Sequence, residues 1–226
     1  MTKNKQHKLP KLVKQGLYDP SFEHDACGVA MIANIKGIKN HSIVEKGLEA
    51  LEHLGHRGAA GADPKTGDGA GIMTQIPDAI FRSELKEDLP PLNKYAVGMV
   101  FLPSQNTDKD HCIKLIEESI LDENMQLIRW RQVPVDPNSI GNTAKDCMPY
   151  ISQFFVTPKS NFTEDEFEFS LFALRRIIER KINLANISED DFYICSLSKN
   201  TIVYKGLLMT DQVRKFYLDL QNESFI

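Results

Sequence analysis

The stretch Glu23-His24-Asp25-Ala26-Cys27-Gly28-Val29 decides how this sequence is interpreted. In it a polar segment gives way to a continuous apolar run, and a thiol stands at the boundary. Free cysteine usually behaves as a small buried hydrophobe. It can also act as a nucleophile that becomes a new N-terminus once the preceding residues are removed, because the α-amino group of its own residue then serves as the base. Both interpretations of Cys27 are open from its immediate context.

Two neighbouring features add candidate site residues. Gly28 carries no side chain and would leave the thiol open to substrate. Arg57, followed by Gly58, could orient a carboxylate or a carbonyl group, or could simply hold its loop in place. His53 and His56 have the spacing of two metal ligands one turn apart, but no second pair of ligands follows at a suitable distance, so no metal site is expected.

The segment from Gly58 to Gly71 reads Gly-Ala-Ala-Gly-Ala-Asp-Pro-Lys-Thr-Gly-Asp-Gly-Ala-Gly. It is not a phosphate-binding loop, because no Gly-Lys-Ser/Thr closes it, and its acidic spacing is not that of an EF-hand. Its glycines predict a backbone that passes close to another group. A packed active-site rim and a plain irregular loop both fit this pattern.

Composition sets the broad class. The 226 residues are 42% hydrophobic and carry a net charge of −4, which favours a globular domain and argues against nucleic-acid binding. The longest apolar runs, such as Ala96–Leu102, are too short to span a membrane. The four cysteines are widely spaced, which indicates free thiols in a reducing compartment, and we expect the cytoplasm. Residues 1–26, rich in lysine at the start, are expected to be a flexible leader rather than a targeting peptide.

The hydrophobic pattern alternates between strands and helices. We expect helices after Ser-x-x-Glu and Thr-x-x-Glu capping boxes at Ser42 and Thr163, and a third helix capped by Asn106 or Thr107. The helix after Thr163 is expected to have an apolar inner face made of Phe167, Leu171, Leu174, Ile178 and Ile182. Strands are expected at residues 27–35, 72–76, 95–102, 127–133, 150–156, 192–197 and 201–205. The first and the third are expected to be covered on both faces, and the fourth to be half exposed, with Arg129 and Arg131 on its polar face. The last two are expected to form a hairpin with a tight turn at residues 198–200. Pattern alone therefore predicts a layered α/β or α+β domain.

Four segments resemble the N-terminal part of the large subunit of the glutamate synthase family, which is a class II glutamine amidotransferase. They are residues 24–29, 54–59, 61–71 and 198–211. The His-Arg-Gly element at position 56 is shared by many class II amidotransferases, whereas the Asp63–Gly71 run is more specific to glutamate synthases.

The resemblance implies a fold and a reaction. The fold would be α+β, a four-layer αββα sandwich of the N-terminal-nucleophile hydrolase type, incomplete at the C-terminus. Residues 1–26 would be a propeptide, and residues 27–226 the N-terminal portion of a truncated amidotransferase domain. The Cys27 thiolate would attack the side-chain amide of glutamine to give a γ-glutamyl thioester and ammonia, and water would then release glutamate. Gly28 and Arg57 would bind substrate or support the site.

The same resemblance implies the wider context. Ammonia would convert 2-oxoglutarate to glutamate in later domains that carry FMN and an iron–sulfur cluster, with no cofactor in these 226 residues. Partners would be glutamine, the remaining synthase domains of the same polypeptide and a small reductase subunit, with no nucleic acid and no membrane.

The sequence departs from the family pattern in two ways. Ala30 replaces an expected glycine, a small change. The chain also has no Asn-Gly pair for the oxyanion hole, and the arginine and aspartate that hold the substrate are expected beyond Ile226. Loss of one oxyanion donor costs on the order of a hundred- to a thousand-fold in rate, so we expect these residues alone to be inactive. Two alternatives are an amidotransferase of another pathway and a non-catalytic module that keeps its leader.

Overall fold

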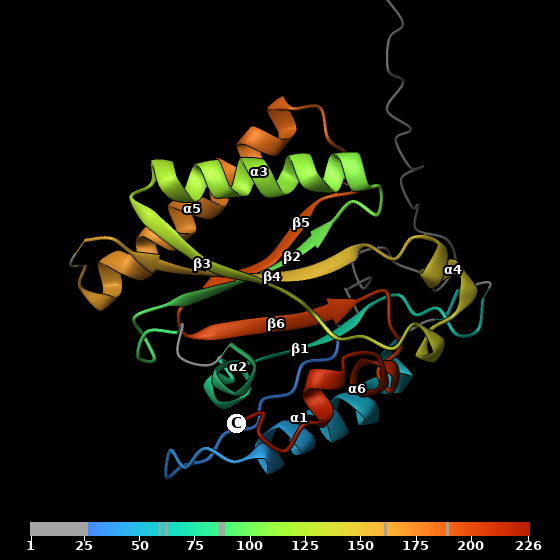
Figure 1. Ribbon diagram of the computed structural model, residues 1–226. Helices are drawn as coiled ribbons and strands as arrows, with labels where there is room; N and C mark the ends of the chain where they lie inside the picture. The colour runs from blue at the N-terminus through green and yellow to red at the C-terminus, as the bar shows by residue number, and fades with distance from the viewer. Residues whose placement is uncertain (1–26, 59, 62, 86–88, 161, 189) are drawn as a thin grey trace, which may run out of the picture.

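Figure 1 shows the computed structural model, which describes residues 27–226 except 59, 62, 86–88, 161 and 189. The predicted leader, residues 1–26, lies outside the described residues. The helices are α1 (His41–His53), α2 (Asp78–Leu85), α3 (Asn106–Asp122), α4 (Asn142–Asp146), α5 (Glu164–Leu184) and α6 (Gln212–Phe216), with 3₁₀ turns η2 (Leu54–Arg57), η4 (Pro137–Ser139) and η5 (Leu218–Gln221). The strands are β1 (Ala70–Gln75), β2 (Ala96–Leu102), β3 (Met125–Gln132), β4 (Tyr150–Pro158), β5 (Tyr193–Ser198) and β6 (Thr201–Gly206).

The molecule is built in four layers. Helices α3 and α5 cover one face of an antiparallel sheet with the strand order β3-β4-β2-β5 (Figure 1). The other face of that sheet packs on a second antiparallel sheet, formed by β1 and β6, and α1 and α6 cover the outer face of this pair. The expected α+β sandwich with the layer order αββα is therefore confirmed.

Strand β2 shows why the sequence produces this layering. Its residues are almost all buried. Side chains of a strand alternate between the two faces of the sheet. Val97 and Met99 accordingly belong to the core between the two sheets, whereas Val100 and Leu102 belong to the core beneath α3 and α5. A strand covered on both faces was expected at residues 95–102, and it is found there.

Helix α5 forms as its capping pattern predicts. The Thr163 hydroxyl accepts a hydrogen bond from the Glu166 N–H, and the Glu166 carboxylate accepts one from the Thr163 N–H, which completes a capping box. These bonds satisfy backbone groups that have no partner inside the helix. The predicted inner face is buried throughout, and consists of Phe167, Leu171, Leu174, Ile178 and Ile182.

The prediction of a buried strand at residues 27–35 is wrong. These residues have no strand pairing and are exposed, with exposed fractions of 89% at Val29 and Met31. An apolar run becomes a covered strand only where a neighbouring strand offers hydrogen-bond partners on its edge. Strand β1 lines the same cavity as this segment and pairs with β6 on one edge, but the structure shows no ladder between its other edge and residues 27–35.

The expected hairpin at residues 192–205 is also wrong, although both strands exist. Strand β5 pairs with β2, and β6 pairs with β1, so the turn between them carries the chain from one sheet to the other. The Ser198 hydroxyl fixes this turn by accepting hydrogen bonds from the Asn200 and Thr201 N–H groups. Tight turns are determined locally, whereas the pairing of the strands that follow is not.

Two predicted helix starts are misplaced. Helix α1 is capped by Asn40, whose side-chain oxygen accepts a hydrogen bond from the Ser42 N–H, rather than by a box at Ser42. Helix α3 begins at Asn106 with Gln105 as its N-cap residue, and no side chain caps it. Asparagine and serine are almost equally good caps, so the sequence between residues 40 and 42 does not determine which is used.

A buried ion-pair network holds the end of the chain against the four-stranded sheet. The Arg131 guanidinium donates two hydrogen bonds of 2.8 Å to Asp219, and it also donates to Glu84 and Gln153. The Tyr204 hydroxyl donates to the same Asp219 carboxylate at 2.9 Å. Arg131 was expected on an exposed face of its strand, but its side chain is only 5% exposed. The network joins α2, β3, β4, β6 and η5.

Candidate active site

Cys27 is the first residue that the structure describes. Its side chain is exposed and carries a free thiol. The extended segment that follows reaches a turn in which the Gly37 N–H donates to the Asn34 carbonyl at 3.0 Å. An exposed thiol at the start of an extended segment is accessible to a small molecule, as a nucleophile must be.

Gly28 places this segment against the end of α1. A Cβ atom added to Gly28 would stand 3.1 Å from the Leu54 Cδ2 atom. Leu54 opens η2, the 3₁₀ turn that ends at Arg57. The structure therefore brings Cys27 and Gly28 beside the turn that contains the His-Arg-Gly element. Arg57 is the last residue of η2, and its side chain lies outside the part of the chain that the structure describes.

At three further glycines in or after η2, the backbone lies close to another part of the chain. A Cβ atom on Gly55 would stand 3.1 Å from the Thr210 hydroxyl oxygen, and one on Gly58 would stand 3.3 Å from an Asp68 carboxylate oxygen. A Cβ atom on Gly67 would stand 2.4 Å from the Leu208 carbonyl oxygen. The prediction that this glycine-rich backbone passes close to another group is thus confirmed. At Gly67 that group is the segment after β6, and at Gly58 it is Asp68 of the same loop.

Asp63 and Gln212 fasten this arrangement, and neither was predicted as a site residue. The Asp63 carboxylate accepts hydrogen bonds from the Lys65 N–H, the Thr66 hydroxyl and the Thr143 N–H, the last of which belongs to the first turn of α4. Hydrogen bonds from the Lys65 and Thr143 N–H groups hold the pKa of Asp63 below its usual value. The Gln212 amide donates to the Lys65 carbonyl at 2.7 Å and accepts from the Met209 N–H at 2.8 Å.

An Asp-Pro-x-Thr sequence signals a local turn of this kind, because an aspartate side chain readily accepts hydrogen bonds from backbone two residues further on. The long-range contacts with α4 and α6 carry no such local signal. They could not be found from the sequence alone.

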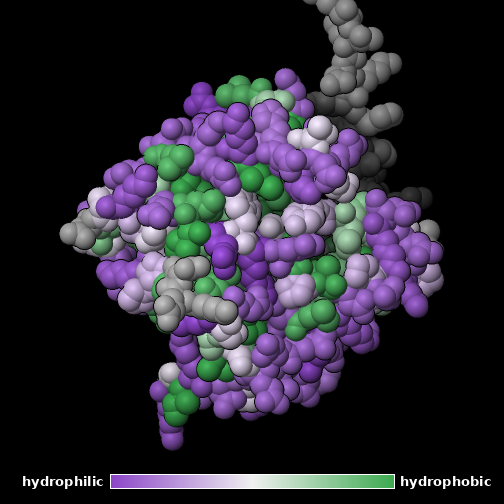
Figure 2. All heavy atoms as spheres, viewed as in Figure 1, coloured by the Kyte–Doolittle hydropathy of each residue, from purple (hydrophilic) through white to green (hydrophobic). Residues whose placement is uncertain are grey.

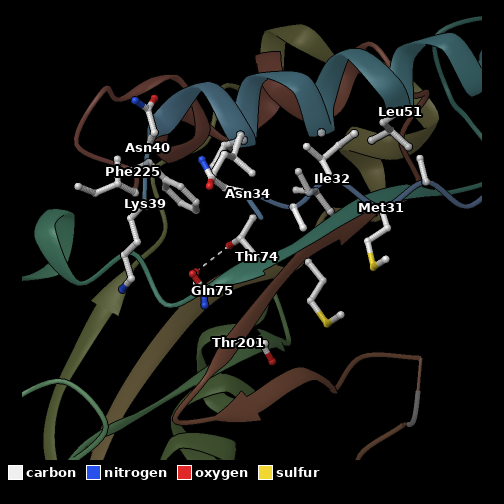
Figure 3. A pocket seen from close by; sticks show the side chains of 18 of the residues that line it. Met31, Ile32, Asn34, Lys39, Asn40, Leu51, Thr74, Gln75, Thr201 and Phe225 are labelled. Carbon is white, nitrogen blue, oxygen red and sulfur yellow. Dashed lines mark hydrogen bonds between the residues drawn. The ribbon is translucent and has the colours of Figure 1, made fainter. Parts of the chain in front are cut away.

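A cavity of about 740 Å³ begins at Gly28 and runs between α1 and β1 (Figure 3). Its walls are mainly apolar, and Asn34, Thr74 and Gln75 supply polar groups (Figure 3). Lys39 is the one charged side chain among the described residues that line it. The cavity is large enough for an amino-acid substrate, and it starts one residue after Cys27, which is not among its lining residues.

The other cysteines differ from Cys27 in their surroundings. Burial raises the pKa of the Cys112 thiol to about 11 and that of the Cys195 thiol to about 12. These two thiols are therefore poor nucleophiles near neutral pH. Cys147 is exposed and lines a smaller, mainly apolar pocket of about 190 Å³ beside α4 and the end of β6. The face of the molecule seen in Figure 2 is mostly hydrophilic, with several patches of hydrophobic residues. The Cys147 thiol donates to the Thr143 carbonyl.

The two histidines near η2 meet through the backbone of His53. The His56 Nδ1 atom lies 3.0 Å from the His53 carbonyl oxygen rather than beside the His53 ring. Within the described residues, no three histidine, cysteine or acidic side chains converge in a way that could hold a metal ion. In the same part of the chain, none of the helices has the length and apolar character needed to cross a membrane.

Comparison with known proteins places the sequence of this chain in a family. The family described as "Glutamine amidotransferases class-II" matches residues 27–226, so the match starts at Cys27. The large chain of NADPH-dependent glutamate synthase from Bacillus subtilis is 44% identical over 222 residues, which cover 97% of this chain and 14% of that protein.

Two relatives with other electron donors are similar over comparable lengths. Ferredoxin-dependent glutamate synthase 1 from Arabidopsis thaliana is 41% identical over 92% of this chain and 13% of its own length. NADH-dependent glutamate synthase from Saccharomyces cerevisiae is 40% identical over 94% of this chain and 10% of its own length. The chain thus spans about a tenth to a seventh of the length of these relatives. With an αββα fold, an exposed thiol where the family match begins and a matching family over residues 27–226, the chain belongs to the class II glutamine amidotransferases.

Proposed function

We propose that residues 27–226 belong to the glutaminase domain of a glutamate synthase, and that Cys27 is its nucleophile after residues 1–26 have been removed. The observation that carries this proposal is the convergence of Cys27 and Gly28, η2, the Gly67–Asp68 turn and the Leu208–Thr210 segment. These are the segments whose sequences resemble the family. Their convergence favours a shared site over four unrelated similarities.

The chemistry follows from an N-terminal cysteine. In the 226-residue chain the Cys27 nitrogen is part of a peptide bond with Ala26, so it cannot act as a base. Cleavage of that bond frees an amine that titrates near neutral pH and can take the thiol proton. The thiolate attacks the side-chain carbonyl carbon of glutamine, the C–N bond breaks, and the nitrogen leaves as ammonia with the transferred proton. Water then hydrolyses the thioester, which gives glutamate and restores the thiol.

The other side chains have supporting roles in this proposal. Gly28 keeps the approach to the thiol open, because a larger residue would meet Leu54. Arg57 supports the substrate or the loop from the end of η2. The amidotransferases of other pathways and a non-catalytic module are less favoured, because the relatives described above are all glutamate synthases.

In the whole protein, the ammonia would be used to convert 2-oxoglutarate to glutamate. The remaining domains of the same polypeptide would carry FMN and an iron–sulfur cluster, and a small reductase subunit would supply electrons in the cytoplasm. The described residues do not fit such a cluster, because Cys112 and Cys195 are buried in separate cores and Cys27 and Cys147 are exposed. No step of the glutaminase reaction depends on either group.

The proposal is tested by trapping the nucleophile in the natural protein that contains these residues. A glutamine analogue that carries a chloromethyl ketone in place of the amide should alkylate Cys27. The alkylated chain should begin at Cys27, because residues 1–26 have been removed. Excess glutamine should protect Cys27. Cys147 is the matched control. Its thiol is also exposed, and glutamine should not protect it from alkylation. Labelling of a chain that still carries residues 1–26, or labelling at Cys27 that glutamine does not reduce, would overturn the proposal.

A further inference from the structure

The outer face of α5 carries a stripe of exposed side chains opposite to its buried face. The exposed fractions are 73% for Phe169 and 61% for Phe172, and the Arg176 side chain is 67% exposed. Asp165, one turn before Phe169, is exposed as well. The spacing of these four residues is four, three and four, which is the spacing of the a and d positions along the seam of a coiled coil. We call them the outer stripe.

The helix that presents the outer stripe is held firmly in place. Its first turn is stabilised by the capping box at Thr163. Its inner face is buried in the core between the two helices α3 and α5 and the four-stranded sheet. Near its end, Lys181 pairs with Asp122 of α3 at 2.7 Å. Two phenylalanine side chains on one face of such a helix are unusual for a free surface, since adjacent exposed apolar groups mark sites of interaction.

The outer stripe is complementary to itself. Asp165 and Arg176 lie at equal distances, along the helix, from the point midway between Phe169 and Phe172. A twofold axis through that midpoint would set Phe169 against Phe172 of the second copy and Asp165 against Arg176 of the second copy. Interfaces of homodimers with twofold symmetry are self-complementary in this way.

We propose that the outer stripe is a homodimer interface in which α5 packs antiparallel against α5 of a second copy of this chain. In a parallel pairing, acidic residues would face acidic residues and arginine would face arginine, and like charges repel. In the antiparallel pairing, each Asp165 carboxylate joins the Arg176–Glu179 ion pair that already exists within the partner's helix. Charge complementarity therefore favours a second copy of α5 as the binding partner, and it favours the antiparallel orientation of the two helices.

The size of the contact sets its strength. A single pair of helices buries less surface than a standard protein interface, so the dimer is weak and forms reversibly as concentration rises. The aromatic pair at the centre supplies most of the binding free energy, because energetically dominant residues cluster in the middle of interfaces. The flanking charges fix the orientation.

Sedimentation equilibrium of the 226-residue chain, from micromolar to millimolar concentration, tests this proposal. We expect a monomer–dimer equilibrium that F169S/F172S weakens at least about tenfold. The matched control is Leu184→Ser on the same helix, because Leu184 is equally exposed at 73% but lies outside the outer stripe. That variant should dimerise as the parent chain does.

A charge exchange distinguishes this dimer from any other association. D165R and R176D should each weaken dimerisation about fivefold, because each sets like charges opposite one another. The combined D165R/R176D variant should restore it. Circular dichroism and thermal unfolding of each variant check that α5 is intact, since Asp165 also lies in the first turn of a helix, where acidic residues are favourable.

Three results would overturn the proposal. They are a chain that stays monomeric at millimolar concentration, a dimer that F169S/F172S does not weaken, and a double charge exchange in a folded protein that does not recover the affinity lost in the single variants.

Discussion

The backbone at Gly67 passes so close to Leu208 that a Cβ atom on Gly67 would stand 2.4 Å from the Leu208 carbonyl oxygen. The obstacle is backbone on both sides, so it cannot be relieved by rotation of a side chain. This contact joins the glycine-rich loop to the segment after β6 beside η2. A residue without a side chain at position 67 therefore allows the loop to pack against this segment at the candidate site.

Replacing Gly67 by alanine should therefore lower the free energy of unfolding by about 1–3 kcal/mol, the range found when an extra group is forced into a well-packed site. Urea unfolding would measure this loss. Gly61→Ala in the same loop is the matched control, because its nearest obstacle is the Thr66 carbonyl oxygen at 3.8 Å. If the two variants are equally stable, the close approach at Gly67 does not exist in solution.

Replacing Asp63 by asparagine should destabilise the protein, because the carboxylate accepts hydrogen bonds that connect its own loop to α4. The effect depends on pH. The pKa of Asp63 is lowered below the ordinary 3.8 in the folded state, chiefly by the hydrogen bond from the Lys65 N–H. A group whose folded pKa is lowered stabilises the protein above its unfolded pKa and loses that contribution as the pH falls through the folded value.

The difference in melting temperature between the parent chain and Asp63→Asn should thus be largest near neutral pH and should shrink at acidic pH, below the ordinary pKa. Glu223→Gln, at an exposed site, provides the control and should change little at any pH. A difference that grows on acidification would contradict the assignment.

Replacing Arg131 by methionine should cost about 3–5 kcal/mol, because it leaves the buried Asp219 carboxylate without its positively charged partner. Burial opposes the charge on Arg131, but hydrogen bonds from its guanidinium to Asp219 and Glu84 outweigh burial and raise its pKa. The double variant R131M/D219N should lose less than the sum of the two single variants, because neither charge is then left unpaired.

Chemical denaturation of all three variants measures this coupling. Lys215→Met breaks the exposed pair of Lys215 with Asp211 and should cost less than about 1 kcal/mol. Equal losses in R131M and K215M would show that the network at Arg131 is open to solvent.

Cys27 and Cys147 should react with iodoacetamide in the native chain, and Cys112 and Cys195 should not. Burial both blocks access to the latter two thiols and raises their pKa values to about 11 and about 12. Peptide mass spectrometry after brief alkylation identifies the modified sites, and the same treatment in denaturant should label all four. Protection of Cys27 in the native chain would show that the segment it begins is covered rather than exposed.

The sequence predicted the elements whose determinants are local. The capping box at Thr163 and the inner face of α5 were both correct, because cap chemistry and helical periodicity act within one or two turns. Strands β2 and β4 were likewise placed correctly from their runs of apolar residues.

The errors fall where partners are remote. Residues 27–35 have the composition of a buried strand, yet burial depends on which segment covers them. The turn at Ser198 was correctly placed, but its two strands join different sheets. Arg131 was assigned to solvent, because its charge partners lie 47 and 88 residues away in the sequence.

The candidate site shows the same division. Cys27, Gly28 and Arg57 were singled out by their residue types and by the resemblance. Asp63 and Gln212, which hold the surrounding loops together, act through contacts with α4 and with the Lys65 carbonyl that no local pattern reveals.

The central claim is that the thiol of Cys27 carries out the attack on glutamine. Its most direct test is the rate of ammonia release from glutamine by the natural protein that contains these residues, with Cys27→Ala compared against Cys147→Ala. We expect Cys27→Ala to abolish release, at a loss of at least a thousandfold or so for a missing nucleophile, while Cys147→Ala keeps the parent rate. Glutamine consumption at the parent rate by a folded Cys27→Ala protein would contradict the account.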